Sequence, residues 1–246
     1  MANNTRGVWS GGINSDQNKM TYTTIQTLGN DTTFGDLLFN PNDTAGTGND
    51  TIGMFAGGGG SQYWATCNYI TIATTSDALN FGDLISARYG CSACANATRA
   101  IYSGGYSARS YSSDYYTIST PSTATNFGDL TSTAGTQYAC GVSDGTKGVI
   151  GGGASYGNSP LTELQYYTIA TPSTATDYGD LATSNGFAGS ATSDGTRALY
   201  GSTDRGGAGS KIGIDYFAIA TGGTAVDFGE LLESRNTAAV GDFIAT

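Results

Sequence analysis

The segment YYTIATPSTATDYGDL spans Tyr166 to Leu181, and related segments occur five times along the chain. Each copy ends in FGDL or a close variant, whose glycines are Gly35, Gly82, Gly128, Gly179 and Gly229. An isoleucine lies ten residues before each glycine, and a tyrosine lies three residues before each isoleucine. The glycines are 47, 46, 51 and 50 residues apart, so the chain is a tandem array of five units.

A period near 48 residues accommodates four short strands and their turns, which is one blade of a β-propeller. Each unit also contains an apolar pair, and such pairs predict a strand that is buried on both faces between neighbouring blades. The pairs are Val8-Trp9, Met54-Phe55, Ile101-Tyr102, Val149-Ile150 and Leu199-Tyr200. We therefore predict one all-β domain over residues 1–246, a five-bladed propeller with four strands per blade. The repeat units are approximately 5–50, 51–97, 98–145, 146–195 and 196–246.

The first unit of the repeat lacks one strand position, and the last segment of the chain occupies that same position. The chain enters its first unit at the strand that leads into Gly11-Gly12, so the first blade lacks an innermost strand. The last segment, 236–246, has the phase of an innermost strand. We predict that it pairs beside residues 6–11 and closes the ring, because closure removes an open strand edge.

Composition excludes several classes of function. The net charge is −10, and the sequence pI near 4.1 disfavours binding to nucleic-acid phosphates or anionic membranes. The chain has no histidine, which removes Ser-His-Asp and Cys-His catalysis and every His-ligated metal site. With no long apolar run and no apolar leader near Met1, we expect a soluble chain without an export signal.

Two recurring features resemble catalytic or ligand sites, and each has a structural interpretation. Glycine pairs follow the apolar strand, but no Lys-Ser/Thr follows them, so they indicate tight turns and not phosphate binding. The carboxylates Asp36, Asp83, Asp129, Asp180 and Glu230 recur once per unit on the predicted outermost strand. Those positions suit turn bonds and edge protection. The predicted inner strands offer only Asp242, which argues against a two-carboxylate glycosidase.

The four cysteines, Cys67, Cys91, Cys94 and Cys140, include a single CxxC. A closed zinc site needs four ligands, and no second pair or histidine completes one. We expect the thiols to pack in the core. A contact or disulfide between Cys94 and Cys140 stays open at this stage. No metal and no cofactor are predicted.

The region from Arg88 to Leu130 resembles a kelch repeat. It contains RYGCSACANATRAIYSGG, then DYYTI, then NFGDL. The resemblance implies an inner strand, a strand ending in Gly-Gly, an aromatic strand and an outer strand. Phenylalanine or tyrosine replaces the usual kelch tryptophan, at Phe34, Phe81, Phe127, Tyr178 and Phe228. The phrase from Tyr166 to Leu181 is also similar to tandem repeats in virion and tail-fibre-like proteins of marine bacteriophages, including cyanophages.

The candidate binding surface is the face where the second-to-third-strand loops and the outer-to-inner loops emerge together. These loops vary most in length and sequence. The candidate partner- or glycan-binding residues are Tyr63, Trp64, Tyr106, Arg109, Tyr111, Tyr156 and Arg205, together with Asp204 and beside Asn40, Asn42, Arg88, Gln137, Asn185 and Arg235. Aromatic rings among polar groups suit protein or carbohydrate recognition. The alternative is that they are ordinary loop tyrosines.

The phage resemblance implies a non-enzymatic structural protein on the outer surface of a virion. It would decorate the capsid or form part of the tail or its fibres, docking on other virion proteins with one face, while the other could contact the host surface. The alternative is a carbohydrate-binding, lectin-type propeller. A lectin predicts similar sugar pockets in every blade, whereas these loops differ in all five units, which favours one asymmetric docking site. A channel glycosidase is the third and weakest alternative.

Overall fold

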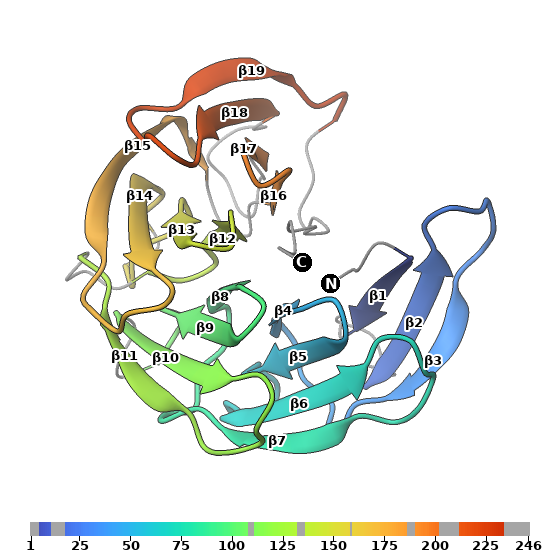
Figure 1. Cartoon of the computed structure of the whole chain (residues 1–246). Coiled ribbons are helices and arrows are strands. Elements are labelled where there is room, and N and C mark those ends of the chain that lie inside the picture. The colour runs from blue at the N-terminus through green and yellow to red at the C-terminus, as the bar shows by residue number, and fades with distance from the viewer. Residues whose placement is uncertain are drawn as a thin grey trace.

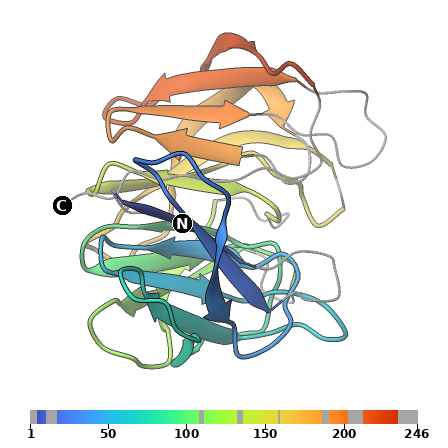
Figure 2. The ribbon, with the colours of Figure 1, turned by 90° about the vertical axis from the view of Figure 1, so that its right-hand side faces the viewer.

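The computed structural model describes residues 5–10, 18–107, 111–131, 136–157, 159–185, 190–201 and 212–233, with the side chains of 183–185 left out. The secondary structure of these residues is all β. No helix among them is long and apolar enough to span a membrane. The strands form five antiparallel sheets that lie around a common centre, as Figure 1 shows, and loops project from both faces of the disc in Figure 2.

Each sheet is one blade, and the strands follow one another outward from the centre. The first blade contains β1 (Arg6–Ser10), β2 (Lys19–Thr24) and β3 (Thr32–Asp36). The second contains β4 (Ala45–Gly48), β5 (Ile52–Ala56), β6 (Thr66–Thr71) and β7 (Leu79–Asp83). The third contains β8 (Ser92–Ala95), β9 (Arg99–Ser103), β10 (Ser112–Thr117) and β11 (Thr125–Asp129). The fourth contains β12 (Cys140–Ser143), β13 (Lys147–Gly151), β14 (Leu161–Thr168) and β15 (Thr176–Asn185). The fifth contains β16 (Ser190–Ser193), β17 (Arg197–Gly201), β18 (Gly213–Ala218) and β19 (Val226–Glu230).

This architecture confirms the predicted five-bladed propeller. The inner strands predicted within 46–49, 91–96, 138–143 and 187–193 correspond to β4, β8, β12 and β16, and each comes from the end of the preceding sequence unit. The first sheet has three strands among the described residues. The predicted fourth, within 236–246, lies outside the described residues, so closure of the ring by that segment stays a prediction.

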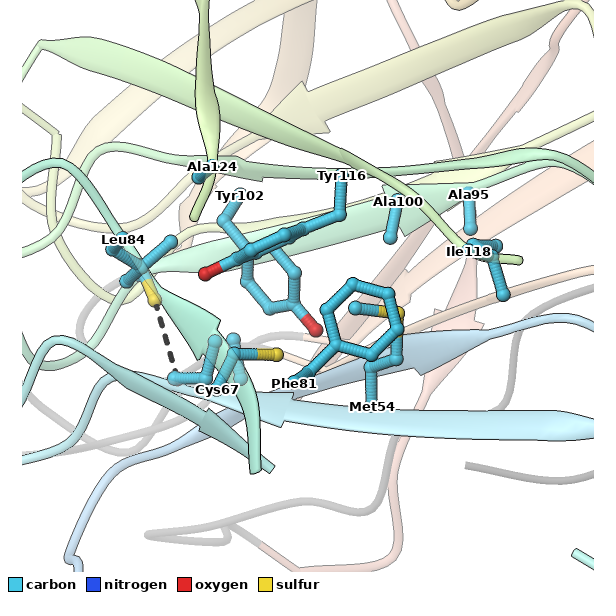
Figure 3. Close-up of a cluster of buried hydrophobic side chains, with 13 residues drawn as sticks. Met54, Cys67, Phe81, Leu84, Ala95, Ala100, Tyr102, Tyr116, Ile118 and Ala124 are labelled. Carbon is cyan, nitrogen blue, oxygen red and sulfur yellow. Dashed lines mark hydrogen bonds between the residues drawn. The ribbon is translucent and has the colours of Figure 1, made fainter. Parts of the chain in front are cut away.

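The core lies in the seams, by which we mean the packed interfaces between successive blades. Figure 3 shows the seam between the second and third blades, where Met54, Cys67 and Phe81 face Tyr102 and Tyr116. The Phe81 and Tyr116 rings meet edge to face, with centroids 5.3 Å apart. Such pairs add stability beyond the burial of their area. Phe34, Phe127 and Tyr178, at the same repeat position as Phe81, are likewise buried.

The FGDL motif supplies the main-chain contacts that hold successive blades together at the seams. Gly82 has a φ of 142°, and an added Cβ would lie 2.0 Å from the carbonyl oxygen of Ser122 in the next blade. Close by, the amide of Ala124 donates to the carbonyl of Asp83 at 2.8 Å. Equivalent amide bonds follow Gly35, Gly128 and Gly179, at 2.7 to 2.8 Å. Glycine is needed because the next blade's backbone occupies the space of a side chain.

The repeated carboxylates lie on β3, β7, β11, β15 and β19, as predicted for the outermost strands. Their side chains make local contacts: Asp36 pairs with Lys19 at 2.8 Å, and Asp180 accepts a bond from Thr162 at 3.0 Å. The sequence did not reveal that the main-chain carbonyl of this residue, and not the carboxylate, holds the next blade.

Truncating a seam residue tests the blade register. Ile118 is buried in the seam shown in Figure 3, and we expect Ile118→Ala to lower the free energy of unfolding by roughly 2 to 5 kcal/mol, because a cavity remains. Leu79 in β7 is exposed, so Leu79→Ala should change it by less than about 1 kcal/mol. Urea unfolding of both variants measures the difference, and equal losses would contradict this packing.

Candidate functional site

Five tyrosine rings gather on one face of the disc. Three were predicted, namely Tyr63, Tyr106 and Tyr156, and two were not, namely Tyr89 and Tyr138. Tyr89 lies at the centre, with centroids 4.9 Å from Tyr63, 5.2 Å from Tyr106 and 6.0 Å from Tyr138. Tyr156 stacks on Tyr106 at 4.8 Å with an interplanar angle of 14°. We call these five residues the tyrosine cluster.

The cluster rests on loops of the second, third and fourth blades. Tyr63, Tyr106 and Tyr156 lie between the second and third strands of their blades, and Tyr89 and Tyr138 lie before an inner strand. The backbones of Tyr89 and Tyr106 form an isolated antiparallel bridge, in which the Tyr106 amide donates to the Tyr89 carbonyl at 2.7 Å. The two predicted loop types therefore meet on one face.

Backbone bonds between successive blades place Tyr138. Its amide donates to the carbonyl of Gly90 at 2.6 Å, and the Gly90 amide donates to the carbonyl of Asp43 at 3.0 Å. Tyr138 has a φ of 57°, a left-handed conformation that is uncommon for a bulky residue. A Cβ at Gly90 would lie 2.8 Å from the Tyr138 ring. Gly90 thus leaves room for a ring that an unfavourable backbone conformation directs into the cluster.

The cluster offers both apolar ring surface and hydroxyl groups. Tyr63 and Tyr156 are 46% and 52% exposed, whereas Tyr89, Tyr106 and Tyr138 are half-buried. A side-chain hydrogen bond with Tyr156, and then charge repulsion from it, raises the pKa of Tyr106 to about 12. The Tyr106 hydroxyl is therefore protonated at neutral pH and can both donate and accept hydrogen bonds.

The other predicted site residues do not join the cluster. Trp64 stacks on Phe39, with centroids 4.5 Å apart. Tyr111 is exposed next to β10, and among the described residues it has no aromatic ring contact. Arg109 and Arg205 lie outside the described residues, as do Asp204, Arg235 and the side chain of Asn185.

Two residues expected on this surface are buried, so that part of the prediction was wrong. Gln137 is buried, and its side-chain amide donates to the main-chain carbonyl of Ser155 at 3.1 Å. Arg88 is 0% exposed and pairs with the Asp114 carboxylate at 2.9 Å. Its guanidinium also donates to the carbonyls of Gly104 and Ser112, at 3.2 and 2.9 Å. Arg88 therefore organises the loops beneath the cluster and is not available to a partner.

The four cysteines lie in the core of the protein. All four are present as buried thiols, which confirms their predicted packing in the core. Burial raises the pKa of Cys91 to about 11 and that of Cys140 to about 12, and it raises the pKa of Cys67 further. In the described part of the chain, no three His, Cys, Asp or Glu side chains are grouped to hold a metal ion.

Comparison with protein-family models gave no match, and comparison with curated proteins gave none either.

Proposed function

We propose that this chain is a non-enzymatic docking module on the outer surface of a bacteriophage particle, and that it binds another virion protein through the tyrosine cluster. The observation that carries the docking role is the gathering of five partly exposed rings on one face. Tyrosine is enriched in the energetically important parts of protein interfaces, because a rigid ring carries both apolar area and a hydroxyl group.

The cluster is a single asymmetric site. The bridge that Tyr89 and Tyr106 form in the third blade has counterparts between Asn42 and Gly59 in the second and between Gln137 and Ala154 in the fourth. The rings therefore do not recur at one position in each blade. One partner contacting three blades fits this arrangement better than a set of equivalent small-ligand pockets.

The virion location is supported by the similarity of the phrase from Tyr166 to Leu181 to repeats of phage structural proteins. In this chain the same phrase builds a seam, because the Ala175 amide in it donates to the Asp129 carbonyl of the preceding blade at 2.8 Å. Such a phrase suits a structural protein. The opposite face of the disc stays available for attachment to the host surface.

A lectin-type propeller is the second candidate. The exposed rings of Tyr63 and Tyr156 favour it, since tyrosine can stack on the apolar side of a sugar while polar groups bond its hydroxyls. On this alternative the same two rings would contact a glycan.

Replacing the two exposed rings tests the proposal. We expect the double variant Tyr63→Ser/Tyr156→Ser to bind purified phage particles that lack the chain roughly a hundredfold more weakly than the natural protein, since two interface tyrosines are removed. Its melting temperature should stay nearly unchanged, because both side chains are about half exposed. Tyr111→Ser removes an exposed tyrosine outside the cluster and should bind normally.

Equal binding by the double variant and the natural protein would contradict docking through the cluster. Binding to a glycan array that disappears in the double variant, without any binding to particles, would instead support the lectin. A double variant that fails to fold would show that the two rings belong to the core.

A further inference from the structure

The first and fifth blades expose side chains whose counterparts in the other blades are buried in seams. Ile25 is 56% exposed, whereas Ile72, Ile118, Ile169 and Ile219 are at most 3% exposed. Phe228 is 57% exposed, whereas Phe34, Phe81, Phe127 and Tyr178 are at most 8% exposed. Trp9 is 45% exposed, although Phe55, Tyr102, Ile150 and Tyr200 at its position are at most 4% exposed. The first blade thus presents one half of a seam, and the fifth presents the other half.

The backbone of the fifth blade has the conformation of a seam without the neighbour. Gly229 has a φ of 151°, close to the 155°, 142° and 146° of Gly35, Gly82 and Gly128. A Cβ at those three glycines would lie within 2.2 Å of a carbonyl oxygen of the next blade, but at Gly229 it would meet nothing within 4 Å. By the repeat register, the segment that would fill this space begins at Gly29, where an added Cβ also meets nothing. The two vacant positions match each other.

In three of the existing seams, a basic side chain of one blade donates hydrogen bonds to main-chain carbonyls of the next blade. Arg6 of the first blade donates to the carbonyls of Ile72 and Ala73 in the second, at 3.0 and 2.8 Å. Arg99 of the third blade donates in the same way to Ile169 and Ala170 in the fourth, at 3.1 and 2.6 Å.

Lys147 of the fourth blade donates to the carbonyl of Ala220 in the fifth at 2.6 Å. The second blade has Ile52 at this position, and the fifth has Arg197. The carbonyls that correspond to these acceptors in the first blade are those of Ile25 and Gln26.

We propose that the exposed faces of the first and fifth blades bind each other as a fifth seam, with Arg197 donating to the carbonyls of Ile25 and Gln26. The occupant of each face is the other face of the same chain. The four existing seams show that these two halves are complementary, and the intervening blades hold them at a high effective concentration. Burial of Ile25, Phe228 and Trp9 would provide the apolar part of the contact.

The residues at this fifth seam would make weaker apolar contacts than their counterparts in the other four seams. Asp31 stands where Ala78, Ala124, Ala175 and Ala225 donate their amides across the other seams. Thr23 stands where the later blades have Ile70, Tyr116, Tyr167 and Phe217. A charged and a small polar residue replace apolar ones, so less apolar area is buried there. We therefore expect the ring of blades to open first at the fifth seam.

Amide hydrogen exchange by NMR tests the proposal on the whole chain. In the closed seam the Asp31 amide donates to the Glu230 carbonyl, so its exchange should be slowed by roughly a hundredfold or more, as for an amide in a stable structural element. Light scattering at the same concentration should show a monomer. Arg197→Met should reduce protection at Asp31 by roughly tenfold and leave Ala78 unchanged. Arg6→Met, the matched control, should reduce protection at Ala78 and leave Asp31 unchanged.

Unprotected exchange at Asp31 in the natural protein would overturn the proposal. Protection that rises with protein concentration together with dimer formation would also overturn it, because a second copy would then occupy the faces. Unchanged protection at Asp31 in the Arg197→Met variant would show that Arg197 does not close the seam.

Discussion

Arg88→Met should lower the free energy of unfolding by roughly 3 to 5 kcal/mol, because removing one member of a buried ion pair leaves an uncompensated charge. Both side chains are almost fully buried, with relative exposures of 0% for Arg88 and 2% for Asp114. The variant would also remove the donors to Gly104 and Ser112. Urea unfolding at neutral pH measures the loss.

The chain itself contains a neutral version of this arrangement, which supplies the control. At the position of Asp114, the second blade has Asn68 and the fourth has Gln165, and each accepts a main-chain amide of the preceding blade. Asp114 accepts the Ile85 amide at 3.0 Å in the same way. Arg88→Met/Asp114→Asn should therefore be more stable than Arg88→Met alone. A loss below about 1 kcal/mol in Arg88→Met would contradict the role given to this pair.

Gly82→Ala is the second variant with a large expected effect. The added Cβ would lie 2.0 Å from the Ser122 carbonyl oxygen, and the residue would keep a φ of 142°. Backbone strain and the clash together should destabilise the protein by more than about 2 kcal/mol. Differential scanning fluorimetry and the yield of folded protein report this loss.

Gly29→Ala is the matched control, since a Cβ there meets nothing and its backbone is not left-handed. Its melting temperature should stay close to that of the natural protein. If Gly82→Ala is equally stable, the next blade does not need the space above the FGDL glycine.

The periodic part of the structure could be predicted from the sequence, because a repeat that recurs in phase fixes the number of blades and the order of their strands. Burial of the apolar pairs followed from the same logic. Trp9 and the half-buried Leu199 depart from it, because the first and fifth blades have no described neighbour on those sides. The role of the FGDL motif could not be predicted, because it lies in the main chain, which every residue type shares.

The site was only partly predictable. The loops were expected on one face, and Tyr63, Tyr106 and Tyr156 meet there. Tyr138 was missed because its left-handed backbone, which directs the ring, leaves no signal in a residue type that rarely adopts it. Arg88 was misplaced because a loop arginine is usually exposed, and only the three-dimensional position of Asp114 makes its burial favourable.

The copy number of this chain in purified virions tests the proposed function most directly. If the proposed function holds, quantitative mass spectrometry of purified phage particles should find the chain at a fixed number per particle. On the order of hundreds would match decoration of a symmetric capsid, and a small multiple of six would match a tail position. Absence of the chain from particles that retain their other structural proteins would contradict the proposal.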